Sequence, residues 1–160
     1  KSEYARRLGK VLEIEVFHLD RLHWNAGWVK KSKDEKRATE GKLVTKDAWI
    51  IDGNYTGTQD IRLPAADTII YLEYPRLICL WRVLKRFLTG LRGIQRSDMA
   101  EGCPERLDWS FIEWVWGFNK RDGPRIMANL SKYTAGKSVV ILRGPREADA
   151  FLDLVKATRK

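Results

Sequence analysis

The sequence has too little cysteine and histidine for a disulfide framework or an ordinary zinc site. Its 160 residues include two cysteines, Cys79 and Cys103, and two histidines, His18 and His23, and none has a zinc-ligand spacing. No apolar run approaches the ~18–20 residues of a membrane-spanning helix, and residues 1–10 are charged where a signal peptide is apolar. We therefore expect a protein of a reducing, cytoplasmic compartment with no membrane partner.

The sequence has fewer acidic than basic residues: 21 Asp and Glu and 30 Lys and Arg give a net charge of +9. This surplus suggests an anionic partner such as a phosphate ligand, a nucleic acid or an acidic surface, although a solvated basic surface explains it equally well. Apolar residues make up 44% of the chain, as in ordinary globular domains. The length fits one domain over residues 1–160.

Apolar patterning predicts strands that alternate with helices. The nearly continuous apolar runs at 48–52 and 67–73 are typical of strands buried on both faces of a parallel sheet. The predicted strands are 13–17, 48–52, 67–73 and 138–143, and the predicted helices are 2–12, 32–45, 75–88, 109–118, 121–135 and 145–158. This order indicates an α/β fold with a parallel sheet flanked by helices.

Local signals mark several helix ends. Ser32 and Glu35 have the spacing of a capping box, Asp108 is a typical N-cap, and Gly136 is a typical C-cap. The 75–88 helix has an apolar stripe of Leu77, Leu80, Trp81, Leu84 and Leu88, with Arg82, Lys85 and Arg86 on its other side. The alternation breaks over 76–135, which predicts a lid-like insertion at about 87–120.

Lys1 and Ser2 directly precede the first predicted helix. A lysine and a hydroxyl residue in this place are the last two positions of a P-loop, where the lysine reaches the phosphates and the hydroxyl binds Mg²⁺. The dipeptide alone is a weak signal, because it occurs often by chance.

Further segments carry a resemblance that covers essentially the whole chain. They are Lys1-Ser2 with 5–9 (ARRLG), 18–20 (HLD), 23–24 (HW), 27–28 (GW), 49–55 (WIIDGNY), 66–68 (ADT), 75–76 (PR), 80–82 (LWR), 102–106 (GCPER) and 139–143 (VVILR). In these segments and their order the sequence resembles the small bacterial P-loop kinase-like proteins known as DNA topology modulation proteins, relatives of adenylate kinase and shikimate kinase. The resemblance implies a P-loop NTPase fold of the nucleoside and shikimate kinase type that binds ATP with Mg²⁺.

The main departure from this family lies at the start of the chain. The family begins with a strand and a G-x-x-G-x-G-K-[ST] loop, of which this chain has the Lys-Ser, and Glu3 stands where Thr is usual. In the adenylate-kinase-like strand order 2-3-1-4-5, the strand that is missing here would separate 48–52 from 67–73. We therefore expect these residues to be a fragment of a longer protein, with weak or no nucleotide binding of their own. A protein with a degenerate site is the alternative.

Acidic residues at two predicted strand ends point to metal and acid–base chemistry. Asp20 lies at the carboxyl edge of the sheet, where ligands of α/β proteins bind, and the resemblance to shikimate kinase implies Mg²⁺ binding or activation of an acceptor hydroxyl. Asp52 looks like the acid of the matching adenylate kinase segment or a Walker-B-like acid. The structural alternatives are a helix-capping Asp20 and a turn at Asp52-Gly53.

Arginines supply the candidates for phosphate contacts. Arg82 and Arg86 lie one helical turn apart, and in adenylate kinases two arginines at this spacing sit over the phosphates. Among the arginines of the insertion and the helix after it (Arg92, Arg96, Arg106, Arg121 and Arg125), we expect one or two phosphate contacts, with Arg121 and Arg125 the better candidates. A solvated helix face is the alternative.

The remaining candidates surround the acceptor and the adenine. Near Asp20 we expect an acceptor pocket lined by His18, Trp24, Trp28, Gly53 and Asn54, with packing as the alternative role of the aromatic residues. Gly144 and Pro145 resemble the loop beside the adenine ring, although a helix start explains them equally well. Trp109, Trp114 and Trp116 are most simply packing residues, with base stacking as the alternative.

The function predicted from these residues is an ATP-binding, Mg²⁺-dependent phosphotransferase that acts on an unidentified small acceptor. The catalytic set is Lys1, Asp20, Arg82, Arg86, Arg121 and Arg125, the cofactor-binding set is Lys1, Ser2, Asp52, Gly144 and Pro145, and the metal ligands are Ser2 and Asp52. The alternatives are a nucleic-acid-binding module, which no recognised motif supports, and a non-catalytic partner-binding domain.

Overall fold

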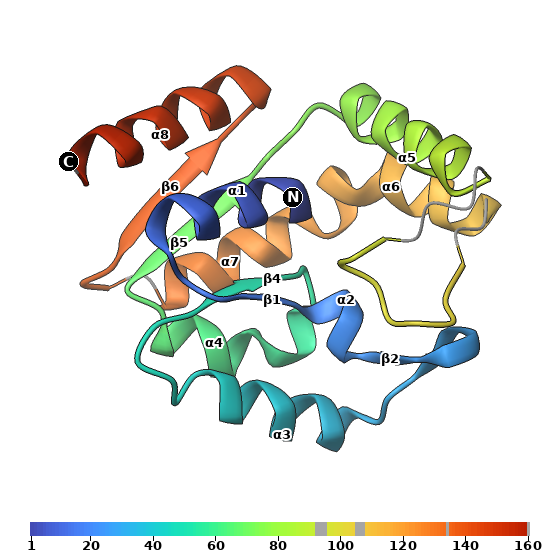
Figure 1. Ribbon diagram of the computed structural model, residues 1–160, viewed down its shortest axis with the longest axis horizontal. Helices are drawn as coiled ribbons and strands as arrows, with labels where there is room; N and C mark the ends of the chain where they lie inside the picture. Colours follow the sequence, from blue (N-terminus) through green and yellow to red (C-terminus); the bar gives the residue numbers. More distant parts are fainter. Residues whose placement is uncertain (92–95, 105–107, 134, 160) are drawn as a thin grey trace.

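Two parallel strand pairs form the centre of the fold. The computed structural model describes residues 1–91, 96–104, 108–133 and 135–159 (Figure 1). In it β1 (Val16–His18) pairs with β4 (Ile50–Asp52), and β5 (Thr68–Leu72) pairs with β6 (Ser138–Leu142). Within these ranges no ladder joins β4 to β5. The α/β class and the parallel pairing are thus confirmed, but the sheet consists of two separate pairs.

The long helices lie close to their predicted positions. They are α1 (Ser2–Leu12), α3 (Lys33–Leu43), α5 (Arg76–Gly90), α6 (Trp109–Arg121), α7 (Gly123–Tyr133) and α8 (Pro145–Thr158). The sequence did not predict the helices α2 (Leu19–Leu22) and α4 (Gln59–Ala65), the 3₁₀ turns at Ala26–Trp28 and Thr56–Thr58, or the small antiparallel ribbon of β2 (Trp24–Asn25) and β3 (Val29–Lys30). None of the helices in the described part of the chain has the length and apolar character that a membrane crossing requires.

Predicted caps are present at several helix ends. Ser32 accepts a hydrogen bond from the Glu35 backbone N–H and the Glu35 side chain accepts one from the Ser32 backbone, which completes the capping box. Asp108 accepts from the backbone N–H of Ser110 at the start of α6. The left-handed conformation of Glu13 ends α1, so β1 begins at Val16 and not at residue 13 as predicted.

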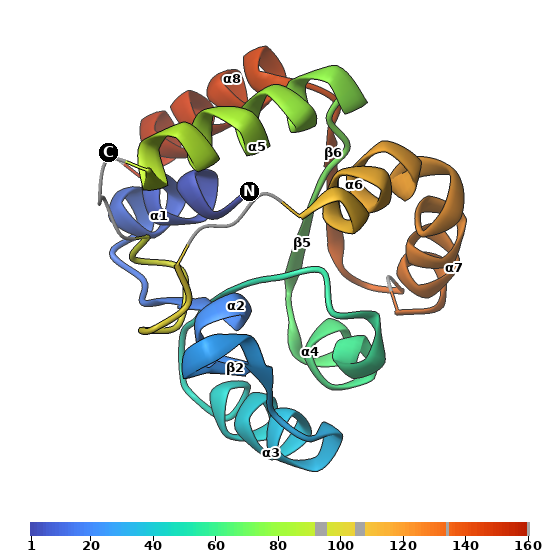
Figure 2. The same cartoon turned by 90° about the vertical axis from the view of Figure 1, so that its right-hand side faces the viewer.

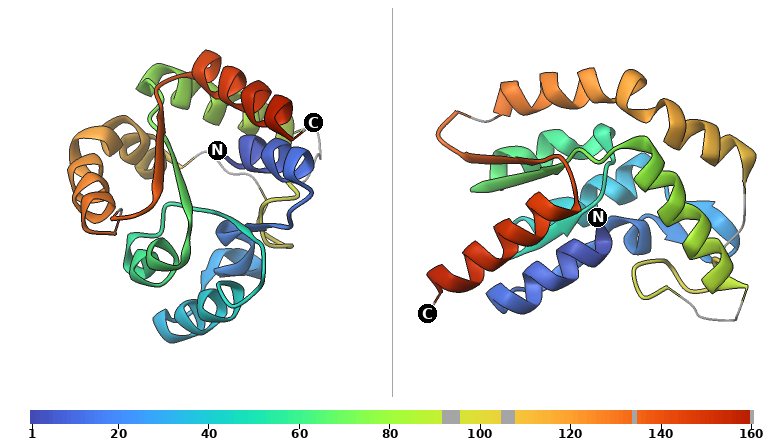
Figure 3. Two further views of the ribbon diagram at one scale, coloured as in Figure 1. Left: turned by 90° about the vertical axis from the view of Figure 1, so that its left-hand side faces the viewer. Right: turned by 90° about the horizontal axis from the view of Figure 1, so that it is seen from above.

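Helices cover both faces of the β5–β6 pair, as Figures 2 and 3 show. Alternate residues of β5 point to opposite sides, because the side-chain period of a strand is two. Ile70 and Leu72 pack into a cluster with residues of α1 and α8, while Ile69 and Tyr71 pack with residues of α4 and α7. The apolar run at 67–73 therefore marks a strand buried on both faces, as predicted.

Helix α1 joins the two strand pairs. Tyr4 and Leu8 of α1 belong to the cluster that includes Leu142 of β6, and Ile50 of β4 packs against the same cluster. Two ion pairs add to the contact between α1 and α8: Arg7 with Asp149, and Arg159 with Glu13. This placement brings the first residues of α1 close to the carboxyl ends of β1 and β4.

The lid-like insertion is described in part. Helix α5 extends to Gly90, and the segment 96–104 lies between α5 and α6. Arg92 and Arg106 lie outside the described residues. Gly102 and Cys103 hydrogen-bond to the 25–27 loop, through Gly27 N–H to the Gly102 carbonyl (2.9 Å) and Cys103 Sγ to the Asn25 carbonyl (3.2 Å). This segment thus packs beside the predicted acceptor loop.

Candidate functional site

The candidate site lies where the N-terminus of α1 meets the carboxyl ends of β1 and β4. The register pairs His18 with Asp52, so the two strands end together. Asp20 follows in the first turn of α2. Nζ of Lys1 lies 3.5 Å from Oδ2 of Asp20 and 3.5 Å from Oδ1 of Asp52. The structure therefore brings together four residues that the sequence predicted for one site.

Asp52 is the most enclosed carboxylate of this site. Its side chain is 6% exposed, and its Oδ2 lies 2.9 Å from Nδ1 of His18. Burial raises the pKa of Asp52, but the hydrogen bonds from His18 and Ser2 and the charge of Lys1 outweigh burial and lower the pKa to about 2. Asp52 therefore stays ionised and can bind a cation or orient His18.

Asp20 is held by an aromatic residue that the sequence did not single out for a role of its own. The Tyr55 hydroxyl donates to Oδ1 of Asp20 at 2.8 Å and accepts from Nε1 of Trp24 at 3.0 Å. Burial and the neighbouring Asp20 carboxylate raise the pKa of Tyr55, so its hydroxyl keeps its proton and remains a donor. One oxygen of Asp20 is thus fixed by Tyr55, and the other faces Lys1.

Asp98, from the insertion, is a further acid at this place. Arg96 donates to both of its oxygens, through Nε at 3.0 Å and a terminal guanidinium nitrogen at 2.6 Å. Burial raises the pKa of Asp98, but Arg96 and a hydrogen bond from Ser2 lower it far below the ordinary range. The sequence predicted Arg96 only as a lid arginine, and no local pattern marks Asp98, because its link to Ser2 spans most of the chain.

A buried ionic cluster supports the loop that carries Gly53 and Tyr55. Glu40 is fully buried, and its carboxylate accepts from Arg62 (2.8 Å) and Thr58 (2.6 Å) and lies 3.1 Å from Nε2 of the buried His23. Arg62 also donates to the backbone carbonyls of Gly53 and Tyr55. The cluster fixes the loop next to Asp20 and Asp52 through the main chain.

Gly53 has a packing role in this loop. A Cβ at this position would lie 2.7 Å from Cβ of Leu19, which is itself fully buried. Gly53 was predicted to line the acceptor pocket, and in the structure its close contact is with Leu19. Asn54, beside it, is exposed.

The predicted arginines fall into two groups. Arg82 stacks on the Tyr74 ring with its guanidinium carbon 4.8 Å from the ring centre, and Arg86 lies 5.6 Å from the centre of Phe111.

Arg121 and Arg125 are not brought to this site. Arg121 contacts Asp122 and the Trp114 carbonyl, and Arg125 is exposed on α7. Within the described ranges no contact joins either residue to Lys1, Asp20 or Asp52. Their predicted phosphate contacts stay predictions.

The remaining predicted residues also fall into two groups, one beside the site and one at the start of α8. Trp28 donates to the Pro104 carbonyl at 3.1 Å, and its ring meets that of Trp24 edge-on at 5.4 Å, so both line the side of the site next to the insertion. Gly144 and Pro145 form the start of α8, as the structural alternative predicts. Their adenine contact stays a prediction.

The site holds the ammonium group of Lys1 between the carboxylates of Asp20 and Asp52 at the N-terminus of α1. Within the described ranges no cluster of three or more His, Cys, Asp or Glu side chains is arranged to hold a metal ion. A Mg²⁺ site needs fewer protein ligands, because the ion is usually bound by one or two carboxylates together with substrate phosphates. Comparison with known proteins adds no identification, since no family model, no curated protein and no solved structure matches the chain.

Proposed function

We propose that this site binds ATP with Mg²⁺ and transfers the γ-phosphoryl group to a small acceptor. The observation that carries the proposal is the position of Lys1: its ammonium group stands at the N-terminus of α1, 3.5 Å from Asp20 and from Asp52, at the carboxyl ends of two parallel strands. Helix N-termini and lysines attract phosphate, and ligands of open α/β sheets bind at this edge.

Each polar residue of the site has a separate role in the proposed reaction. Ser2 and Asp52 would hold Mg²⁺, which neutralises charge on the phosphates when it is bound. Asp20 accepts the proton of the acceptor hydroxyl while the hydroxyl oxygen forms a bond to the γ-phosphorus and the bond to the ADP oxygen breaks. Tyr55 fixes the orientation of Asp20, and the guanidinium groups of Arg82 and Arg86 stabilise the transferring group.

The strand arrangement supports the same assignment. In the kinases that this sequence resembles, a central strand that leads into the phosphate loop lies between two strand pairs. Here β4 pairs with β1 and β5 pairs with β6, and no ladder joins β4 to β5 in the described part of the chain. In this proposal the two pairs correspond to the strand pairs on either side of that central strand.

Titration of MgATP by calorimetry tests the proposal, on the protein that the complete open reading frame encodes. We expect saturable binding, and we expect Lys1→Ala to weaken it by at least about tenfold, because a charge-assisted phosphate contact is lost. Lys10→Ala is the matched control, since Lys10 is exposed at the other end of α1. Unchanged affinity in a folded Lys1→Ala protein would rule the assignment out.

A second variant tests the catalytic step. Asp20→Asn keeps a similar shape and the partner of Tyr55 but cannot accept a proton. We expect it to bind MgATP and to lose phosphoryl transfer in an acceptor screen. Full turnover by Asp20→Asn would remove Asp20 from the reaction while leaving nucleotide binding in place.

A further inference from the structure

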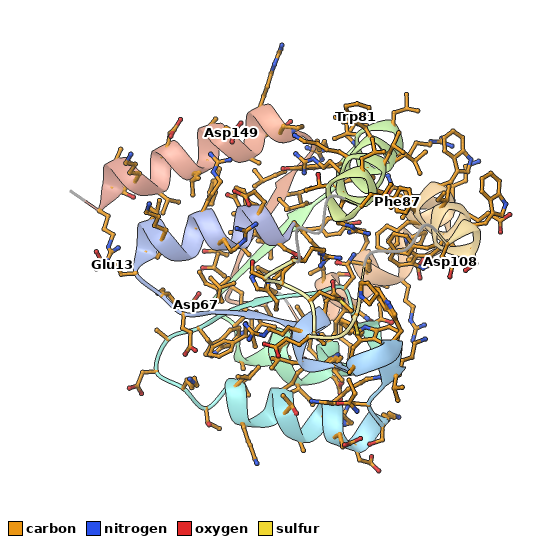
Figure 4. The ribbon with its side chains drawn as sticks, turned by 45° about the vertical axis from the view of Figure 1, so that its right-hand side comes forward. Glu13, Asp67, Trp81, Phe87, Asp108 and Asp149 are labelled. Carbon is orange, nitrogen blue, oxygen red and sulfur yellow. The ribbon has the colours of Figure 1, made fainter. Side chains whose placement is uncertain are left out.

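Helix α5 turns its apolar stripe away from the molecule. Four large apolar side chains of α5 and that of its C-cap residue Leu91 repeat at helical spacing and are between 42% and 69% exposed; the four are Leu77, Trp81, Leu84 and Leu88. We call these five residues the outer stripe. In Figure 4 Trp81 lies on the outer side of α5, whereas Phe87 lies on the side next to α6. A helix packed in the ordinary way would bury such a stripe.

The opposite side of α5 explains this orientation. Ile78 and Cys79 pack against the cluster that also contains Tyr74 and Leu142, and Arg82 stacks on Tyr74. The inward face of the helix thus makes only a small apolar contact, and the exposed Arg82 lies at its edge over Tyr74. In the part of the chain that the structure describes, no residue covers its larger apolar face.

The charged residues of helix α5 itself are all basic. Helix α5 contains Arg76, Arg82, Lys85 and Arg86 and no acidic residue. Lys85 is exposed beside the stripe, and the Arg76 guanidinium lies 4.7 Å from the ring centre of Trp116, which is itself half exposed on α6. The whole chain carries +9. The partner of this face is therefore expected to be anionic as well as apolar.

We propose that α5 lies flat on the surface of an anionic lipid bilayer, with the outer stripe at the level of the headgroups. Leu and Trp on one face of a helix, basic residues beside them and no acid are the features of interfacial helices. Trp in particular favours the boundary between headgroups and acyl chains. The sequence has no segment long and apolar enough to span a membrane, which predicted no membrane partner, but binding at a bilayer surface needs no such segment.

A bilayer fits these residues better than a second copy of the chain. Two copies of α5 packed stripe to stripe would bring together two helices that contain no acidic residue to pair with the exposed Lys85 of the other copy. Like charges at such a contact are unfavourable. An anionic bilayer accepts the apolar residues and balances the basic ones.

Vesicle sedimentation tests this proposal on the full chain, with vesicles of phosphatidylcholine alone and with added phosphatidylglycerol. We expect binding to the anionic vesicles, little to the neutral ones, and a blue shift of tryptophan fluorescence on binding. Leu84→Glu should weaken the binding by at least about tenfold, because it places a charge in the stripe. Leu154→Glu is the matched control, an exposed leucine on α8 that should bind as the unchanged protein does.

Other results would overturn the proposal. These are the absence of binding to anionic vesicles, equal binding by the Leu84→Glu and Leu154→Glu proteins, or a dimer in solution that Leu84→Glu dissociates. The last result assigns the outer stripe to a second copy of the chain. The test does not depend on the proposed nucleotide site, because neither variant alters a residue of that site.

Discussion

At the scale of single residues, the site depends on an ionised carboxylate in a nearly closed position. Asp52 keeps its charge because His18, Ser2 and Lys1 surround it. A buried carboxylate without such partners would take up a proton, since burial disfavours the charged form. The same contacts that prepare Asp52 to hold a cation therefore also stabilise the fold, which links the site to the pH dependence of unfolding.

This link predicts a loss of stability in acid. The pKa of Asp52 is lowered from 3.8 to about 2, so its contribution is present above pH 3.8 and is lost as the pH falls toward 2. The contribution is on the order of 2 kcal/mol of unfolding free energy. We expect Asp52→Asn to lose this amount near neutral pH and to show a smaller further loss in acid than the unchanged protein.

Urea unfolding from about pH 7 to about pH 2 measures both effects. The control is Asp153→Asn, an exposed carboxylate on α8 whose replacement should leave the pH dependence as it is. If the Asp52→Asn protein lost stability in acid as steeply as the unchanged protein, the pKa of Asp52 would not be lowered by its neighbours.

At the scale of elements, one buried and one exposed ion pair connect α3 to α4. Inside, Glu40 of α3 accepts from Arg62 of α4 at 2.8 Å, and both side chains are less than a tenth exposed. At the surface, Arg37 of α3 binds both oxygens of Asp60 of α4, at 2.9 and 2.8 Å. The two links connect the same helices but differ in burial, which allows a direct comparison.

We expect the buried link to dominate stability. Glu40→Ala leaves the Arg62 guanidinium buried without its carboxylate, which costs about 3–5 kcal/mol of unfolding free energy. Asp60→Ala breaks an ion pair that water screens, so its unfolding midpoint should move far less. Chemical denaturation of the two variants checks this, and equal losses would show that Glu40 is not the residue that fixes this part of the fold.

The same elements show what the sequence could and could not predict. The capping box at Ser32 and the strand runs were predictable because their signals are local. Helix α4 was missed because it is short and contains Pro64. The periodicity of α5 identified its stripe but not the side that faces the core, since that depends on what the neighbouring elements present.

The same distinction between local and long-range signals decides which site residues could be predicted from the sequence. Lys1, His18, Asp20 and Asp52 were predictable because each lies at the start of a helix or at the end of a strand, and parallel strands end at one edge. Asp98 is brought to Ser2 by an insertion whose path no local pattern specifies.

At the scale of the whole molecule, the positive surplus is dispersed and partly paired. Lys46 binds Glu15, Arg7 binds Asp149 and Arg159 binds Glu13, at places on α1, α8 and the segments before the strands. A protein that binds nucleic acid by its backbone instead gathers its cations into one patch or stripe. The spread of these pairs over several elements therefore argues against a nucleic-acid surface of this kind.

This arrangement predicts weak DNA binding. A protein surface with few clustered cations neutralises few DNA phosphates and therefore releases few counterions from the DNA. In a plot of the logarithm of the affinity against the logarithm of the salt concentration, we expect a slope of less than about three released ions. A DNA-binding series from about 50 mM to about 200 mM salt measures that slope. Lys85→Ala and Lys156→Ala, on α5 and α8, should each leave it nearly unchanged. A steep slope that one of these variants lowers by about one ion would locate a nucleic-acid surface on that helix and place the nucleic-acid function ahead of the kinase.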